Sequence, residues 1–115
     1  MPAWVLLVTK NILDVPRLEA EVRISGFSPR NAPDLARMHV LLGRGEAPAA
    51  AVVDLVSTGE EGLRAVKELC LATRVVAIAP SGLPDLGLRA ERLGAQIVEA
   101  SDATGFLRLL LTADS

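Results

Sequence analysis

Reactive and metal-binding residues are scarce in this sequence. Its 115 residues include one cysteine, Cys70, one histidine, His39, and no tyrosine. The single cysteine excludes an internal disulfide and a multi-cysteine metal site, and its apolar neighbours predict a buried, inert thiol. His39 has no cysteine or acidic cluster nearby, so we expect a surface or half-buried residue of a helix rather than a ligand or a base. Because no nucleophile–base pair can be assembled, an enzyme with its own substrate is the least supported class.

Charge of one sign and long apolar runs are also missing. The formal net charge is -2 and the aromatic content is 3%, which argues against binding of nucleic acid through bulk positive charge or through stacked bases. No apolar run reaches the roughly 18 residues that a membrane span requires. The N-terminus lacks the basic region and the small-residue cleavage site of a signal peptide. We therefore expect a cytoplasmic protein without a membrane segment and without direct contact to nucleic acid.

What the sequence has in quantity is aliphatic side chains. Half of its residues are hydrophobic and 23% are charged, a balance that is typical of a folded domain with its own core. Because aromatic residues are few, that core must consist of valine, leucine, isoleucine and alanine. At this length we expect one domain over residues 1–115.

Short apolar runs alternate with amphipathic segments along the chain. Continuous apolarity predicts strands that are covered on both faces, over residues 4–8, 27–30, 50–56, 74–79 and 96–100. Apolar residues at helical spacing, with capping residues before them and glycines after, predict helices between these strands and after the last one. We expect these helices to begin near Asp14, at Asn31 as N-cap, at Gly59, at Pro84 and after Ser101.

Five strand–helix units in succession define the fold class. Such alternation predicts a parallel sheet with helices on both faces. Right-handed crossovers make it an α/β, doubly wound, three-layer sandwich of the flavodoxin-like type, with the strand order 2-1-3-4-5. Sites in such folds form at the carboxyl ends of the strands, near the topological switch point. In this chain those ends are Thr9–Lys10, Asp54, Ala79 and Ala100–Ser101.

Over essentially its whole length, the chain resembles the receiver domain of bacterial two-component response regulators. The segment VVDLVSTGEEGL, residues 52–63, is similar to the family's third strand with its aspartate, the following short loop and the Gly-Leu that opens the third helix. The segment ERLGAQIVEAS, residues 91–101, is similar to the family's step into the fifth strand. The resemblance implies a signalling domain in which Asp54 lies where the family carries its phospho-acceptor.

The rest of the family's active site is not matched. Receiver domains carry a metal-binding acidic pair after strand one, a switch serine or threonine after strand four and a lysine after strand five. At the matching positions this chain carries Thr9, Lys10, Ala79 and, depending on register, Ala100 or Ser101, with Ser81 as a partial substitute for the hydroxyl. Phosphoryl transfer to a carboxylate brings two anions together, and a divalent cation and a lysine normally neutralise that charge. A lone carboxylate does not supply the hard ligand set that Mg²⁺ requires.

We interpret Asp54 as a strand-terminating carboxylate in a degenerate pocket, paired with Lys10 or capping a backbone amide. The function that follows is a pseudo-receiver, a non-catalytic regulatory protein that acts through protein–protein contacts and needs no cofactor. One alternative is an active receiver that a histidine kinase phosphorylates on Asp54, which would require Mg²⁺. Another is a regulator similar to anti-sigma-factor antagonists, in which Ser57 or Thr58 lies nearest the phosphorylated serine, although the N-terminal strand–helix unit fits that family poorly.

A partner surface is also implied by the resemblance. Receiver domains commonly meet partners on the face of the fourth helix, fifth strand and fifth helix, which here contains Leu86, Arg89, Arg92, Phe106 and Leu109. The last predicted helix carries leucines on more than one side, so some are exposed unless another chain covers them. We therefore expect a protein partner or a second copy of the chain at this face.

Overall fold

A parallel sheet runs through the middle of the molecule, in the strand order β2-β1-β3-β4-β5. The computed structural model describes residues 3–80, 82 and 84–99. Its strands are β1 (Trp4–Val8), β2 (Ser28–Ala32), β3 (Ala50–Asp54), β4 (Arg74–Ala79) and β5 (Gln96–Glu99), and its helices are α1 (Val15–Ile24), α2 (Leu35–Leu42), α3 (Leu55–Leu69) and α4 (Pro84–Arg92). All neighbouring strands pair in parallel. The predicted fold class and strand order are confirmed, and the helix predicted after Ser101 lies outside the described residues.

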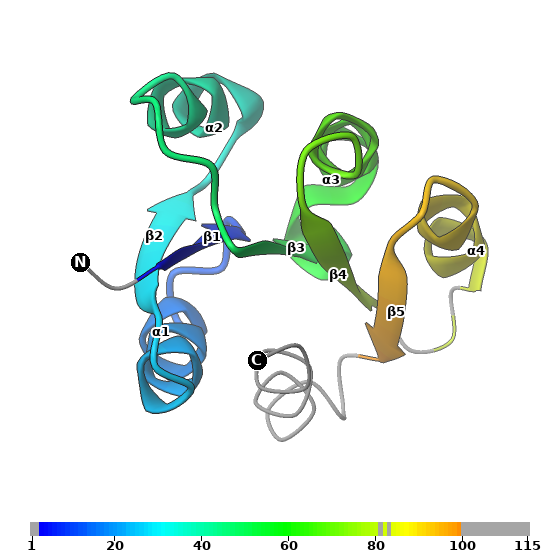
Figure 1. Cartoon of the computed structure of the whole chain (residues 1–115). Helices are drawn as coiled ribbons and strands as arrows, with labels where there is room; N and C mark the ends of the chain where they lie inside the picture. Colours follow the sequence, from blue (N-terminus) through cyan, green and yellow to red (C-terminus); the bar gives the residue numbers. More distant parts are fainter. Residues whose placement is uncertain (1–2, 81, 83, 100–115) are drawn as a thin grey trace.

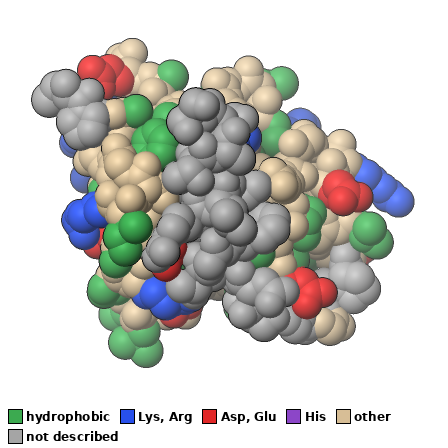
Figure 2. Space-filling view, turned by 60° about the horizontal axis from the view of Figure 1, so that its bottom comes forward, with side chains coloured by type: hydrophobic (Ala, Val, Ile, Leu, Met, Phe, Trp, Pro, Cys, Tyr) green, Lys and Arg blue, Asp and Glu red, His purple; other side chains and the backbone are tan. Residues whose placement is uncertain are grey.

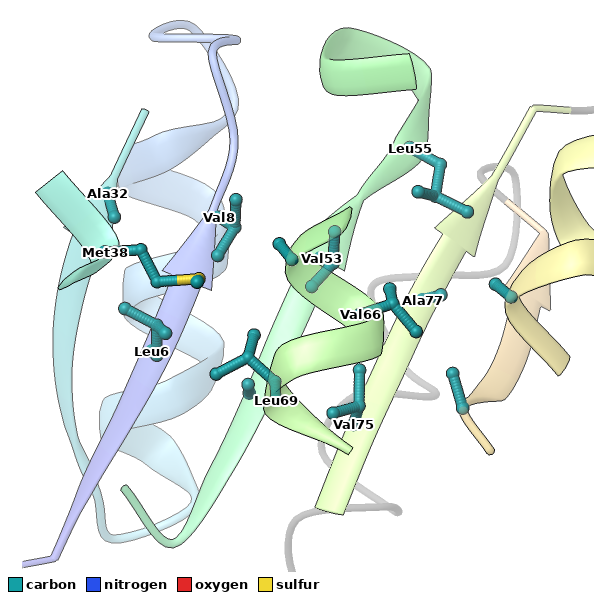
Figure 3. Packing of buried hydrophobic residues seen from close by; sticks show 14 of the residues in the cluster. Leu6, Val8, Ala32, Met38, Val53, Leu55, Val66, Leu69, Val75 and Ala77 are labelled. Atoms are coloured by element: carbon teal, nitrogen blue, oxygen red, sulfur yellow. The ribbon is translucent and has the colours of Figure 1, made fainter. Parts of the chain in front are cut away.

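The sheet separates two apolar layers, as Figure 1 shows by placing α2, α3 and α4 on one side and α1 on the other. Successive side chains of a strand point to opposite faces, so Leu6 and Val8 face the α2–α3 side, whereas Val5 and Leu7 face α1. Figure 3 shows the first layer, in which the side chains of Met38 from α2 and Leu69 from α3 lie among those of the strands. Burial of both strand faces explains why the strands read as continuous apolar runs rather than alternating ones.

The start of α2 differs from the prediction. Asn31 belongs to β2, where it pairs with Leu7, and is not a helix cap. The N-cap is Asp34, whose Oδ1 accepts a hydrogen bond from the backbone N–H of Arg37 at 2.8 Å. Pro33 accounts for the shift, because a proline disfavours helical backbone at the residue before it and so keeps Ala32 extended.

The junction between β3 and α3 also differs from the prediction. The strand ends at Asp54 and the helix begins at once at Leu55, whereas the sequence predicted a strand to residue 56 and a helix from Gly59. Gly59 instead interrupts the helix, with φ 57° and ψ -127°. An added Cβ there would meet nothing within 4 Å, so backbone conformation and not space requires glycine. The residues between Asp54 and Gly59 therefore form a separate helical turn at the carboxyl edge of the sheet.

The surface of the described part of the molecule is mixed in charge. On the face shown in Figure 2, basic, acidic and hydrophobic side chains are interspersed rather than gathered by kind. Among the described residues, no helix combines the length and the apolarity that crossing a bilayer would require.

Candidate functional site

Asp54 lies at the carboxyl end of the central strand β3, beside the end of β1. Its side chain is 6% exposed and accepts three hydrogen bonds. Oδ1 accepts from the backbone N–H of Val56 at 3.0 Å. Oδ2 accepts from the hydroxyls of Thr9 and Ser57, each at 2.9 Å. A buried carboxylate is costly unless it is paired or hydrogen-bonded, and here one backbone amide and two hydroxyls meet that need.

The acceptor of each of the two hydroxyl protons can be assigned. A hydroxyl has one proton to donate. The Thr9 oxygen also accepts from the backbone N–H of Asn11 at 3.1 Å, and the Ser57 oxygen accepts from that of Lys10 at 3.0 Å. Since both protons go to Asp54, the 3.2 Å separation between the two hydroxyl oxygens is a close contact rather than another hydrogen bond. Asp54 thus links the β1–α1 loop to the first turn of α3.

Asp54 is also the N-cap of α3. It has extended backbone angles, and its Oδ1 takes the free amide of the second helical residue, Val56. A carboxylate at this position satisfies an orphan N–H and interacts favourably with the positive end of the helix dipole. The Thr58 hydroxyl donates to the Asp54 carbonyl at 2.7 Å and closes the same turn. Of the two roles that the sequence left open for Asp54, capping of a backbone amide is the one observed.

The predicted pair between Lys10 and Asp54 is not formed. The Lys10 ammonium lies 2.6 Å from Oε1 of Glu61 on α3, and its side chain is 47% exposed. The other oxygen of Glu61 accepts from the backbone N–H of Leu35 at the start of α2, at 3.1 Å. Lys10 therefore joins Glu61 and the start of α2, while Asp54 accepts from three other donors. The hydrogen bonds from Lys10 and from the Leu35 amide lower the pKa of Glu61, and the bond to Glu61 raises the pKa of Lys10.

A small hollow of about 70 Å³ opens beside Asp54. Its walls include Asp14 and Arg17, and its remaining lining is Asn11, Leu18, Val56 and Ile78. Asp14 is already engaged, since it accepts from the Asn11 amide at 3.0 Å and lies 3.6 Å from the Arg17 guanidinium. A divalent cation here would meet the guanidinium of Arg17 together with the carboxylates of Asp14 and Asp54. No cluster of three or more histidine, cysteine, aspartate or glutamate side chains that could hold a metal ion occurs within the described ranges. At the positions after β1, where the receiver family carries the acidic pair that would hold Mg²⁺, this chain has Thr9 and Lys10, so the only carboxylates at this hollow are Asp14 and Asp54 among the described residues.

Several residues predicted for the pocket or weighed as reactive are now placed. Ala79 ends β4 as a buried residue and brings no hydroxyl. Ser81, Ala100 and Ser101 lie outside the described residues. Cys70 is half-buried rather than fully buried, and burial raises the pKa of its thiol, which makes the reactive thiolate rarer. His39 is a surface helix residue, as expected, with Nε2 2.7 Å from Oε2 of Glu68.

The predicted partner face is placed in part. Leu86 is partly buried and packs against the core. The Arg89 guanidinium forms a bidentate interaction with Glu60 of α3, in which Nη1 donates to Oε1 at 2.6 Å and Nη2 donates to Oε2 at 2.9 Å. Arg92 and Leu88 are exposed. Phe106 and Leu109 lie outside the described residues.

Sequence reasoning missed the role of Ser57 as a donor to Asp54. The available signal was an aspartate followed directly by residues that can start a helix, with a serine three positions later. Treating Gly59 as the beginning of the helix concealed that signal, because it left Ser57 in a loop.

Comparison with known proteins adds information at the level of the fold. No protein-family model and no curated protein matches the sequence. Among solved structures, a response regulator from Thermotoga maritima aligns over 98% of this chain and 99% of its own, with 16% identity and a TM-score of 0.74. A response regulator from Burkholderia pseudomallei with a phosphorylated aspartic acid, a calcium ion and citrate aligns over 95% and 66%, with 19% identity and a TM-score of 0.77. NtrX from Brucella abortus in complex with ATP aligns over 99% of this chain, with 21% identity and a TM-score of 0.82, and the chain spans 28% of NtrX.

The fold and the comparisons together define the class. A parallel sheet in the order β2-β1-β3-β4-β5 with helices on both faces is a doubly wound, flavodoxin-like domain. Within that class, the chain has the fold of response-regulator receiver domains.

Proposed function

We propose that this chain is a receiver-like regulatory protein that acts through protein–protein contacts and without phosphorylation of Asp54. The observation that carries this proposal is the hydrogen bonding of the carboxylate. Both of its oxygens accept from protein donors, and Lys10, which follows β1 at the same edge of the sheet, is bound to Glu61. In phosphoryl transfer the acceptor oxygen must approach an anionic phosphoryl group with cations in place. At Asp54 an approach to Oδ2 would displace two hydroxyl donors. The described cation at the adjacent hollow, Arg17, already lies 3.6 Å from Asp14.

Exposure to beryllofluoride and to acetyl phosphate, each with Mg²⁺, tests the proposal. We expect no mass gain with acetyl phosphate and no change in the ¹⁵N–¹H spectrum with beryllofluoride beyond that of Mg²⁺ alone. The matched control is Asp54→Asn, which keeps the side-chain volume and removes the acceptor. A mass gain or a spectral change in the original chain that is lost in Asp54→Asn would establish phosphorylation and overturn the proposal.

An active receiver is the second candidate, and the hollow beside Asp54 is the observation that favours it. Each carboxylate oxygen has two acceptor positions, and Oδ1 uses one of them for Val56. The hollow of about 70 Å³ is lined by both of these residues. One of the structures that share this fold carries a phosphorylated aspartic acid. The experiment above separates the two candidates directly.

The contacts of such a regulator belong, in our proposal, to the face of α4 and β5, in the cytoplasm. Exposed Leu88 and Arg92 support this choice, because an apolar and a charged side chain lie at the surface of the same helix. Partners on this face are proteins, either a different chain or a second copy of this one.

A further inference from the structure

A second surface hollow, of about 350 Å³, lies between α4 and the ends of β4 and β5, and Asp54 is not among its described lining residues. Its described lining consists of Ala79, Pro80, Gly82, Gly87, Leu88 and Ile97, together with Glu91 and Glu99. Figure 1 shows α4 and β5 side by side at this end of the sheet.

Gly87 and Leu88 set its shape. A Cβ added to Gly87 would lie 3.3 Å from the Ala79 side chain and 3.5 Å from Ile97, so the helix approaches the sheet closely at this point. The next residue, Leu88, is 52% exposed and brings an unburied apolar side chain to the same wall. An apolar wall left open to water favours a partner that covers it.

The two carboxylates give the hollow its charge. Glu91 follows Leu88 by three residues on α4, which places both on one side of the helix, and Glu99 ends β5 on the other wall. Both side chains are exposed, and neither forms an ion pair or hydrogen bond with another described residue. The nearby Arg89 is already held by Glu60 and Asp85. The hollow therefore combines an apolar floor with two uncompensated negative charges.

From this geometry we infer that the hollow binds a segment of a different protein in which apolar side chains are flanked by lysine or arginine. The inference rests on the proposed function and names the chemistry of its partner. Charge complementarity selects this occupant over a second copy of the chain. Two copies that met at this hollow would bring four carboxylates together. In each copy, Arg92 is the one cation of α4 that has no described partner and could offset them. Opposite charges across an interface steer association and select the partner.

The test uses two short synthetic peptides with the same leucine face, one flanked by arginines and the other by glutamates. Titrated into the ¹⁵N-labelled chain, the arginine peptide should shift the amide signals of Gly87, Leu88 and Ile97, whereas the glutamate peptide should not. In Glu91→Lys/Glu99→Lys the Kd for the arginine peptide should rise about tenfold, because two attractions become repulsions. Leu88→Ser should also weaken binding. The control is Glu46→Lys, which reverses one charge in the exposed loop before β3, away from the hollow.

Three results would overturn the inference: equal binding of both peptides, unchanged affinity after the charge reversals, or no binding at all. Sedimentation that shows a dimer lost in Glu91→Lys/Glu99→Lys, without peptide binding, would assign the hollow to a second copy instead. Repeating the titration with Mg²⁺ and beryllofluoride separates this inference from the proposed function. Peptide binding that appears only with Mg²⁺ and beryllofluoride would refute the proposal that the chain acts without phosphorylation of Asp54. The inference that the hollow binds this peptide would still hold.

Discussion

At Asp54, two hydroxyl groups and one backbone amide meet a carboxylate at the end of the central strand. Thr9 and Ser57 each donate their only proton to the same oxygen. Hydrogen bonds to a charged acceptor are stronger than those between neutral groups. Removing one donor leaves a buried acceptor less satisfied and carries a penalty of its own. The physical role of this carboxylate is to connect β1, β3 and the first turn of α3.

A substitution of Thr9 measures that connection. Thr9→Val preserves shape and removes the hydroxyl, so we expect a loss of about 1–3 kcal/mol in the free energy of unfolding, measured by urea denaturation. In the background of Asp54→Ala the same substitution should cost clearly less, because the acceptor is gone. Equal costs in the two backgrounds would show that the hydroxyl acts independently of Asp54.

At the scale of elements, the two glutamates after Gly59 tie α3 to both of its neighbours. Glu60 binds Arg89 of α4, and Glu61 binds Lys10 of the β1–α1 loop as well as the first amide of α2. The break at Gly59 makes this possible, because the helix restarts there in a new direction relative to its first turn. Exposed ion pairs are individually weak, so the value of this arrangement lies in fixing the direction of α3.

The contact of Glu61 predicts a defined dependence on pH. Its pKa in the folded chain is lowered from the ordinary value of 4.5, so its contribution is present above that pH and is lost as the pH falls through the lowered pKa. In urea denaturation the original chain should exceed Glu61→Gln in stability at pH 7, and the difference should shrink below pH 4.5. The control is Glu46→Gln, since Glu46 contributes only its backbone carbonyl to a described hydrogen bond. A difference that stays constant down to pH 3 would contradict the assigned contact.

At the scale of the whole molecule, the parallel sheet brings the ends of β1 and β3 together, so the residues after β1 decide what surrounds Asp54. The receiver family that the chain resembles carries acids there, and this chain carries Thr9 and Lys10. The same fold can therefore present either a metal-binding cluster or a hydrogen-bonded cap. Function in such folds depends on the site and not on the fold.

This dependence can be tested by adding carboxylates. Thr9→Asp/Lys10→Asp should lower the Tm without metal, because like charges then crowd Asp54, and Mg²⁺ should restore it. Magnesium at one hundred times its Kd adds about 2.7 kcal/mol, which at roughly 4 °C per kcal/mol raises the Tm by about 10 °C. The Tm of the original chain should not respond to Mg²⁺ relative to EDTA. A comparable rise in the original chain would reveal a metal site formed by its own residues.

The sequence by itself determined the fold class, the strand order and most of the element positions. Strands buried on both faces must be continuously apolar, so β1 and β4 were predicted at their observed bounds. The helices between them followed from apolar spacing and from glycines such as Gly94, whose φ of 109° ends the segment after α4. These features depend on residues that are close together in the chain, so the pattern of a single sequence predicts them.

Only the tertiary structure decided which groups meet at the carboxyl edge. Lys10 could be placed near Asp54 from the strand order, but its choice of Glu61 depends on α3 and α2 approaching the same loop. Ser57 reaches Asp54 because the helix begins before Gly59, which the sequence pattern did not reveal. Which side chains become partners depends on differences of a few ångströms between residues that are far apart in the chain. The apolar periodicity of the sequence indicates only whether a residue faces the core.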